Sequence, residues 1–180
     1  MTEATRTLIQ ALNEAWRVAL IYVLILFLLL VMMSNWVLPY FSVLKPQLML
    51  VAVFYWTLYR PGIMPSWVVF ILGLILDLAN PVLPLGTHAF SYLLVVGLLR
   101  PRRRMLMGQS FMIVWVAFVI AVLLDLGVST LMLSMGTSAS IPGSVLSVHA
   151  IATILAFPLI LTILVGLHRL LPPGRGMIAA

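Results

Sequence analysis

The chain reads Gly73-Leu-Ile-Leu-Asp77-Leu-Ala-Asn80-Pro-Val-Leu-Pro-Leu-Gly86-Thr-His88 where one apolar run ends and the next begins. This stretch places a carboxylate, Asp77, inside a segment whose other residues belong in lipid. A charged side chain near the centre of a bilayer costs about 2.5–3.5 kcal/mol on insertion scales, so such residues mark structural or functional contacts. A second Leu-Asp-Leu, centred on Asp125, lies inside another apolar run. Two of the four acidic residues therefore need an explanation.

The composition predicts an all-α integral membrane protein. Of the 180 residues, 64% are hydrophobic and only 8% are charged, whereas an ordinary soluble chain is about 45–50% apolar and about 25% charged. The absence of cysteine excludes disulfides, a thiolate nucleophile and thiolate metal sites. The basic pI does not indicate nucleic-acid binding, because the basic residues lie at the ends of apolar runs, where topology signals belong.

Charge, proline and glycine divide the apolar sequence into six predicted membrane spans. They cover about 18–38, 46–59, 64–80, 86–99, 110–135 and 145–171. The second to fourth spans are short for a bilayer, so we expect them to be packed among the first, fifth and sixth. Residues 1–17 are predicted to form an amphipathic cytoplasmic lead-in, either lying on the membrane surface or continuous with the first span. Residues 172–180 are predicted to form a short cytoplasmic tail.

The distribution of charge supports six spans with both termini in the cytoplasm. In that arrangement nine arginines lie on one side of the membrane and only Lys45 lies on the other. This asymmetry is typical of the positive-inside rule. Treating 64–99 as one long helix would move the cluster Arg100, Arg102, Arg103 and Arg104 to the outer face and remove the asymmetry.

Polar residues inside the predicted spans fall on particular helix faces. Gly73, Asp77 and Asn80 share one face of the third span, at intervals of three and four residues. Topology places them in the outer half of the membrane, together with the following set of residues: Gly86, His88, Asp125 and His149. Three readings are open. The aspartates bond to nearby Ser, Thr, His or a helix N-terminus, or the Gly73/Asp77 face binds a helix of a partner, or the residues line a ligand pocket. For His88 we expect a cap at the start of span four or a bond to Asp77.

The residues give no sign of catalysis or metal binding. Two intramembrane aspartates resemble the pair of aspartyl peptidases, which share a proton and activate water. The Gly-x-Gly-Asp motif of the intramembrane enzymes and the asparagine-rich motifs of lipoprotein signal peptidases are both absent. No His-x-x-x-His or Glu-x-x-His spacing indicates a metal site. We therefore expect a protein that is not an enzyme and has no cofactor.

Several motifs occur together in the first four spans. They are Pro46 with Tyr55-Trp56 nine and ten residues further on, Arg60-Pro61, Gly73-Leu-Ile-Leu-Asp77 and Pro84-Leu-Gly86-Thr-His88-Ala. In this combination the chain resembles the rod shape-determining protein MreD family, most clearly over 46–100. After about residue 105 only the hydropathy profile is similar.

The resemblance implies a non-enzymatic role in bacterial cell shape. Proteins of the MreD family act in the elongation complex, or elongasome, which directs side-wall peptidoglycan synthesis at the cell inner membrane. The implied partners are MreC, MreB, and RodA with its penicillin-binding transpeptidase. The arginine cluster is expected to anchor the topology, or in addition to contact anionic lipid or a cytoplasmic partner.

A second class of protein has similar size and topology. The substrate-binding subunits of energy-coupling-factor vitamin transporters are small six-span proteins with short helices that carry polar residues. In such a protein Asp77, His88, Asp125 and His149 would contact a ligand from the outer side. A ligand pocket usually has more convergent polar groups than these four.

Overall fold

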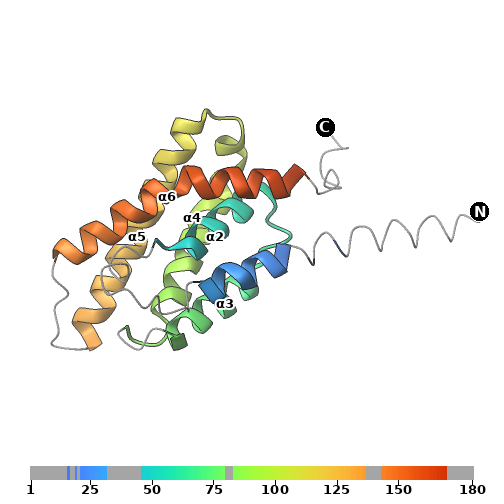
Figure 1. The fold of residues 1–180 in the computed structure, drawn as a ribbon. Helices are drawn as coiled ribbons and strands as arrows, with labels where there is room; N and C mark the ends of the chain where they lie inside the picture. The colour runs from blue at the N-terminus through green and yellow to red at the C-terminus, as the bar shows by residue number, and fades with distance from the viewer. Residues whose placement is uncertain are drawn as a thin grey trace, which may run out of the picture.

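The computed structural model describes residues 16, 19, 21–31, 46–79, 83–136 and 143–169. All regular secondary structure in these residues is α-helix (Figure 1). A first helix covers Ile21–Val31. It is followed by α2 (Leu48–Tyr59), α3 (Ser66–Ala79), α4 (Thr87–Met107), α5 (Phe111–Gly136) and α6 (Gly143–Arg169). Most of the predicted lead-in 1–17, the tail 172–180, Lys45 and Asn80 lie outside the described residues.

The helices occupy the apolar ranges that the sequence predicts, with one clear difference. The fourth predicted range ends at residue 99, but α4 continues through Pro101 to Met107. The arginine cluster therefore lies on the last turns of a helix and not in a loop. Arginine is a good helix former, and the helix ends only at Gly108, the C-cap residue of α4.

The central element of the fold is α2. Ten of its twelve residues, Met49 to Leu58, are buried, and it packs against α4, α5 and α6. A helix that is apolar on every side is stable only when it is surrounded. Twelve residues extend about 18 Å, which is short for a bilayer. Because protein covers α2 on all sides, its length does not have to match the thickness of a membrane.

Three phenylalanines join α2 to the two longest helices. The ring of Phe54 meets the rings of Phe118 and Phe157 edge-on, with centroids 5.2 and 5.9 Å apart. The rings of Phe118 and Phe157 stack on each other at 4.2 Å. All three side chains are fully buried. Aromatic pairs in these geometries add about 0.5–1.5 kcal/mol each beyond their burial, so this cluster holds α2, α5 and α6 together.

Pro158 in α6 leaves one backbone carbonyl without its helical hydrogen bond, and a side chain of α5 donates to that carbonyl. Pro158 lies inside the helix and has no N–H, so the carbonyl of Ile154, four residues earlier, lacks its usual helical partner. The indole Nε1–H of Trp115 on α5 points at this carbonyl oxygen at 3.4 Å. The bond is long, but the indole N–H replaces the backbone donor that the Ile154 carbonyl lacks.

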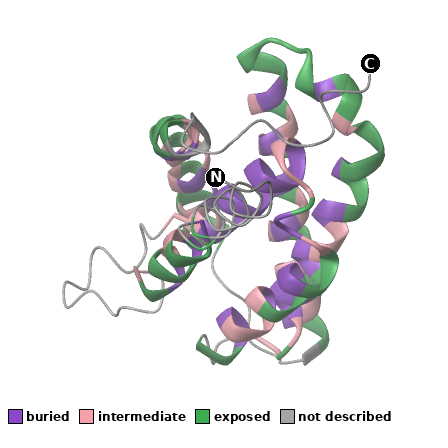
Figure 2. Ribbon diagram, turned by 90° about the vertical axis from the view of Figure 1, so that its right-hand side faces the viewer, coloured by how far each residue is buried: buried purple, intermediate pink, exposed green. Residues whose placement is uncertain are grey.

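The expectation that α3 is enclosed by other helices is wrong. Among α2 to α6, α3 packs mainly on α4, and its other side exposes Trp67, Phe70 and Leu78. Figure 2 shows the same division across the molecule, with buried residues on the inward faces and exposed ones outside. An apolar face needs no protein cover if lipid covers it, so hydrophobicity alone could not place α3 inside.

Candidate functional site

The carboxylate of Asp77, near the end of α3, caps the first turn of α4. Its Oδ2 accepts hydrogen bonds from the backbone N–H of Gly86 at 3.0 Å and of Ala89 at 3.3 Å. Its Oδ1 accepts one from the backbone N–H of His88 at 2.9 Å. The first N–H groups of a helix have no partner within it and carry a partial positive charge. The Asp77 carboxylate accepts hydrogen bonds from these N–H groups, and its negative charge complements the partial positive charge of the helix N-terminus.

The imidazole of His88 completes this arrangement. Its Nδ1 lies 2.7 Å from Asp77 Oδ1, and both side chains are buried. The bond between His88 and Asp77 that the sequence predicts as one of two roles for His88 is therefore present. His88 thus contacts the same carboxylate oxygen through its backbone and through its ring, and Asp77 has four polar partners. We call this set, Asp77 with Gly86, His88 and Ala89, the α3–α4 cap.

Two glycines make the cap geometrically possible. Gly86 is the N-cap residue of α4 and has φ +96°, a conformation that glycine adopts at little cost. Gly73 lies one turn before Asp77, where α3 crosses α4 closely. A Cβ at this position would lie 2.4 Å from the Cα of Ala89. The Gly73/Asp77 face is therefore occupied by α4 of the same chain, and it is not a free surface for a partner.

The second aspartate is bonded to α4 one turn further along. Asp125 on α5 accepts a hydrogen bond of 2.6 Å from the hydroxyl of Ser91, and both residues are buried. The two aspartates therefore attach neighbouring elements to successive turns of α4. The hydrogen-bond partners of Asp77 and Asp125 are different groups, and the two carboxylates are not bonded to each other. An aspartyl peptidase, in contrast, uses two carboxylates that share a proton.

On α6, His149 and Thr153 extend the polar region. His149 lies within electrostatic range of Asp125 and His88. The hydroxyl of Thr153 donates to the His149 carbonyl at 2.8 Å and accepts from the backbone N–H of Gln47 at 3.0 Å. The latter bond gives the start of α2 an acceptor from α6. Of the two carboxylates and two imidazoles, the structure joins Asp77 to His88 directly, bonds Asp125 to Ser91, and leaves His149 in electrostatic interaction with Asp125 and His88.

Sequence reasoning missed Tyr92, which lies beside the cap. Its ring packs edge-on against His88 with centroids 5.8 Å apart. It is fully buried, and its hydroxyl has no hydrogen-bond partner among the residues that the structure describes. The signal for it was available, because Tyr92 follows His88 by four residues and therefore shares its helix face. Within the described ranges, no group of three or more His, Asp or Glu residues is arranged to hold a metal ion.

At the opposite end of the bundle, two of the clustered arginines bond to the end of α2 and the turn that follows it. Arg103 Nε donates to the carbonyl of Leu58 at 2.7 Å, at the C-terminus of α2, where the helix dipole favours a cation. Arg100 donates to the carbonyl of Met64 at 3.0 Å and to the hydroxyl of Ser66 at 2.9 Å. Arg102 and Arg104 are exposed. The cluster is therefore divided between structural and outward-facing residues.

This division predicts unequal effects within the cluster. We expect Arg103→Gln to lower the free energy of unfolding by about 1–3 kcal/mol, because charge-assisted bonds to the last carbonyls of α2 are lost. Arg104→Gln removes the same charge from an exposed position and is expected to change stability by less than about 0.5 kcal/mol. Thermal unfolding of both variants in detergent is the measurement. Equal loss of stability in the two would show that net charge, and not the contact with α2, is responsible.

Comparison of the chain with models of known protein families, with characterised proteins and with solved structures found no match.

Proposed function

We propose that the chain is a six-span protein of the bacterial inner membrane. Two helices, Phe111–Met135 and Gly143–Gly166, are long and apolar enough to cross a membrane by length and composition. Only 28% and 22% of the residues in their most apolar stretches are buried. The core helix of a soluble protein buries its apolar side chains, whereas α5 and α6 expose residues such as Ile120, Met135 and Leu159. Large exposed apolar surfaces indicate contact with lipid or with another protein.

In this proposal both termini are cytoplasmic and the arginine cluster marks the cytoplasmic end of the bundle. The cluster and Arg60 lie together at the end opposite to the α3–α4 cap, because Arg100 and Arg103 bond to the segment that connects α2 to α3. The positive-inside rule then assigns this end to the cytoplasm. The cap, Asp125 and His149 belong to the outer half.

Changing Arg102, Arg103 and Arg104 together to glutamate tests this orientation. We expect the variant to insert wrongly or to be degraded, because the charge asymmetry that sets topology is reversed at its strongest point. Reporter fusions at the C-terminus, one active only in the cytoplasm and one active only outside it, measure the outcome. Unchanged orientation and amount of the triple variant would contradict the assignment, and Arg104→Glu alone is the control for a single charge.

Within the membrane we propose a non-enzymatic adaptor of the elongation complex that contributes to cell shape and side-wall peptidoglycan synthesis. The observation that carries this proposal is that the α3–α4 cap uses the most distinctive polar residues inside the chain. Asp77 is saturated by α4, and Asp125 is bonded to Ser91. Both carboxylates are thus engaged within the chain and are not available to bind a substrate. Contact with other membrane proteins would then be made by the apolar outer faces.

Four of the residues behind the resemblance to the MreD family support the same view, because they have structural roles in the unit of α2, α3 and α4. Trp56 is buried in the centre of the bundle. Gly73 permits the crossing of α3 and α4, Asp77 caps α4, and Gly86 supplies the positive φ of the turn. These residues fix the arrangement of α2, α3 and α4, which an adaptor needs more than it needs reactive side chains. We propose MreC as the direct partner, with MreB and RodA and its transpeptidase in the same complex.

Affinity purification of the chain from native membranes in mild detergent, followed by mass spectrometry, tests the adaptor role. Recovery of MreC together with RodA and its transpeptidase is the expected result. Tryptophan variants of exposed apolar positions, Phe70→Trp on α3 and Leu159→Trp on α6, would then locate the contact by the loss of recovery. Recovery of a transporter's coupling subunit with its ATPases would contradict the proposal and favour a vitamin-transport subunit.

A further inference from the structure

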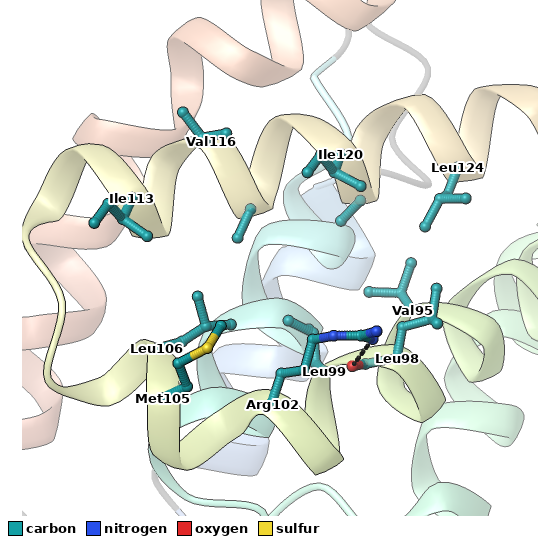
Figure 3. Close-up of a pocket in the computed structure, with 12 residues that line it drawn as sticks. Val95, Leu98, Leu99, Arg102, Met105, Leu106, Ile113, Val116, Ile120 and Leu124 are labelled. Atoms are coloured by element: carbon teal, nitrogen blue, oxygen red, sulfur yellow. Dashed lines mark hydrogen bonds between the residues drawn. The ribbon is translucent and has the colours of Figure 1, made fainter.

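An open groove runs between α4 and α5 on the outside of the bundle (Figure 3). Its volume is about 480 Å³, within the range of about 300–1,000 Å³ that is usual for ligand sites. Eleven of its twelve lining residues are aliphatic or methionine, and the twelfth is Arg102. Ala117 and Ala121 contribute from α5, where their small side chains leave space between the two helices.

Among the described residues that line this groove, Arg102 is the only charged one, and no carboxylate of the described chain pairs with it. Figure 3 shows its side chain extending along α4 toward Leu98. The bond from its Nη1 to the Leu98 carbonyl is 3.4 Å long, much longer than the common 2.9–3.0 Å. Arg100 and Arg103, in contrast, make bonds of 2.7–3.0 Å to the α2–α3 segment. A guanidinium has five N–H donors, so most of those of Arg102 are available to a ligand.

An anion for Arg102 has to come from outside the described part of the chain. The acidic residues described are Asp77 and Asp125, and both are bonded within the other half of the bundle. A cation against apolar surface is costly unless it is paired. Guanidinium groups bind phosphate with two parallel hydrogen bonds, and a phosphate at this position would complete the site.

The order of the lining residues indicates what accompanies the phosphate. Arg102 lies nearer to the α4–α5 turn, the basic end of the molecule, than to the other end of the groove, which Val95 and Leu124 line. Beyond Arg102, on the side of the turn, the groove is lined by Met105, Leu106 and Ile113. Seven residues separate Val95 from Arg102, which corresponds to about 10 Å of helix. The exposed side chains along this length include Leu98 and Ile120. An exposed guanidinium near the basic end of the molecule, with aliphatic lining that continues from it toward the middle of α4 and α5, matches one molecule, an anionic phospholipid.

We propose that the α4–α5 groove binds an anionic phospholipid, with one acyl chain in the groove and its phosphate on the guanidinium of Arg102. The proposal rests on the membrane location proposed above, and it is independent of the adaptor role. A bound lipid here covers apolar surface that no other helix of the described chain covers. It also links α4 to α5 on the side opposite to the contact between α4 and α3.

Native mass spectrometry of the full chain tests this site. The protein is purified in mild detergent and mixed with equal amounts of phosphatidylglycerol and phosphatidylcholine. The unaltered chain is expected to retain phosphatidylglycerol at least about fivefold over phosphatidylcholine, which corresponds to one charge-assisted contact. Arg102→Gln is expected to abolish the preference, and Arg104→Gln, which alters the exposed neighbour, is expected to keep it.

Filling the groove tests the apolar part separately. Ile120→Trp changes an exposed residue and is expected to reduce retention of both lipids by at least about fivefold; Ala117→Leu replaces it if the tryptophan variant does not fold. Retained preference in Arg102→Gln, or equal loss in Arg104→Gln, overturns the proposal. So does a groove-filling variant that keeps its lipid but loses a co-purifying membrane protein, because the occupant would then be a partner helix. Lipid binding with no recovery of elongation proteins would refute the adaptor role alone.

Discussion

Replacing Asp77 with leucine is expected to lower the free energy of unfolding by about 3–5 kcal/mol, because several buried hydrogen-bond partners of one carboxylate lose it at once. Three backbone N–H groups at the start of α4 lose their acceptor, and the buried ring of His88 loses its carboxylate. Water cannot replace the carboxylate at a side chain that is completely buried. We therefore expect the first turn of α4 to fray and the contact between α3 and α4 to loosen.

Thermal unfolding in detergent, followed by circular dichroism, measures this effect. Asp125→Leu is the matched control, because it removes a buried carboxylate of the same shape that accepts one bond from Ser91. We expect it to cost less than half as much. Asp77→Asn should fall between them, since its amide nitrogen cannot accept from two of the N–H groups. Unchanged stability of Asp77→Leu with normal complex formation would rule out both the cap and any partner contact through this residue.

Replacing Gly73 with alanine is expected to cost about 3 kcal/mol, at the upper end of the usual cost of overpacking. The added Cβ would lie 2.4 Å from Ala89 Cα and 2.6 Å from Ala89 N. Both atoms are backbone, so no side chain can rotate away and the two helices must separate. Separation also lengthens the bonds between Asp77 and the start of α4. One methyl group is therefore expected to damage both the crossing and the cap.

Two other helical glycines provide controls for this variant. A Cβ at Gly97 or at Gly127 would meet nothing within 4 Å. Alanine in a helix is favoured over glycine by up to about 1 kcal/mol, so both control variants are expected to be neutral or slightly stabilising. Equal losses in all three would mean that the crossing is unimportant. In the Asp77→Leu background, Gly73→Ala should cost less than in the unaltered chain, because the two changes act on the same contact.

Hydropathy and its interruptions were sufficient to locate the helices. The sequence predicts breaks at Arg60-Pro61 and from Asn80-Pro81 to Pro84, and α2 and α3 end next to these signals, at Tyr59 and Ala79. The end of α4 was missed because Pro101 and its arginine neighbours are usual signs of a break. In the structure Arg100 and Arg103 bond to the turn after α2 and to the end of α2. These contacts, together with the helix propensity of arginine, stabilise the helix beyond Pro101.

The candidate site was predictable only in part. The pairing of Asp77 with His88 followed from topology, because both lie close to one turn. The backbone partners of Asp77 and Arg103 could not be read from the sequence, since every residue except proline carries the same N–H and every residue the same carbonyl. The unequal roles within the arginine cluster depend on which residues face α2 and which face α5, and this follows from helix packing.

Composition and residue spacing were enough to predict the helices, their approximate positions and the few polar residues that need partners in apolar surroundings. The tertiary structure decided which groups pair, that α2 lies at the centre and that α3 leaves one side exposed. Apolar burial has no direction and is proportional to area, so helices of nearly equal hydrophobicity can be arranged in several ways. The choice among them depends on close geometry, such as the missing Cβ at Gly73 and the carboxylate that reaches the start of α4.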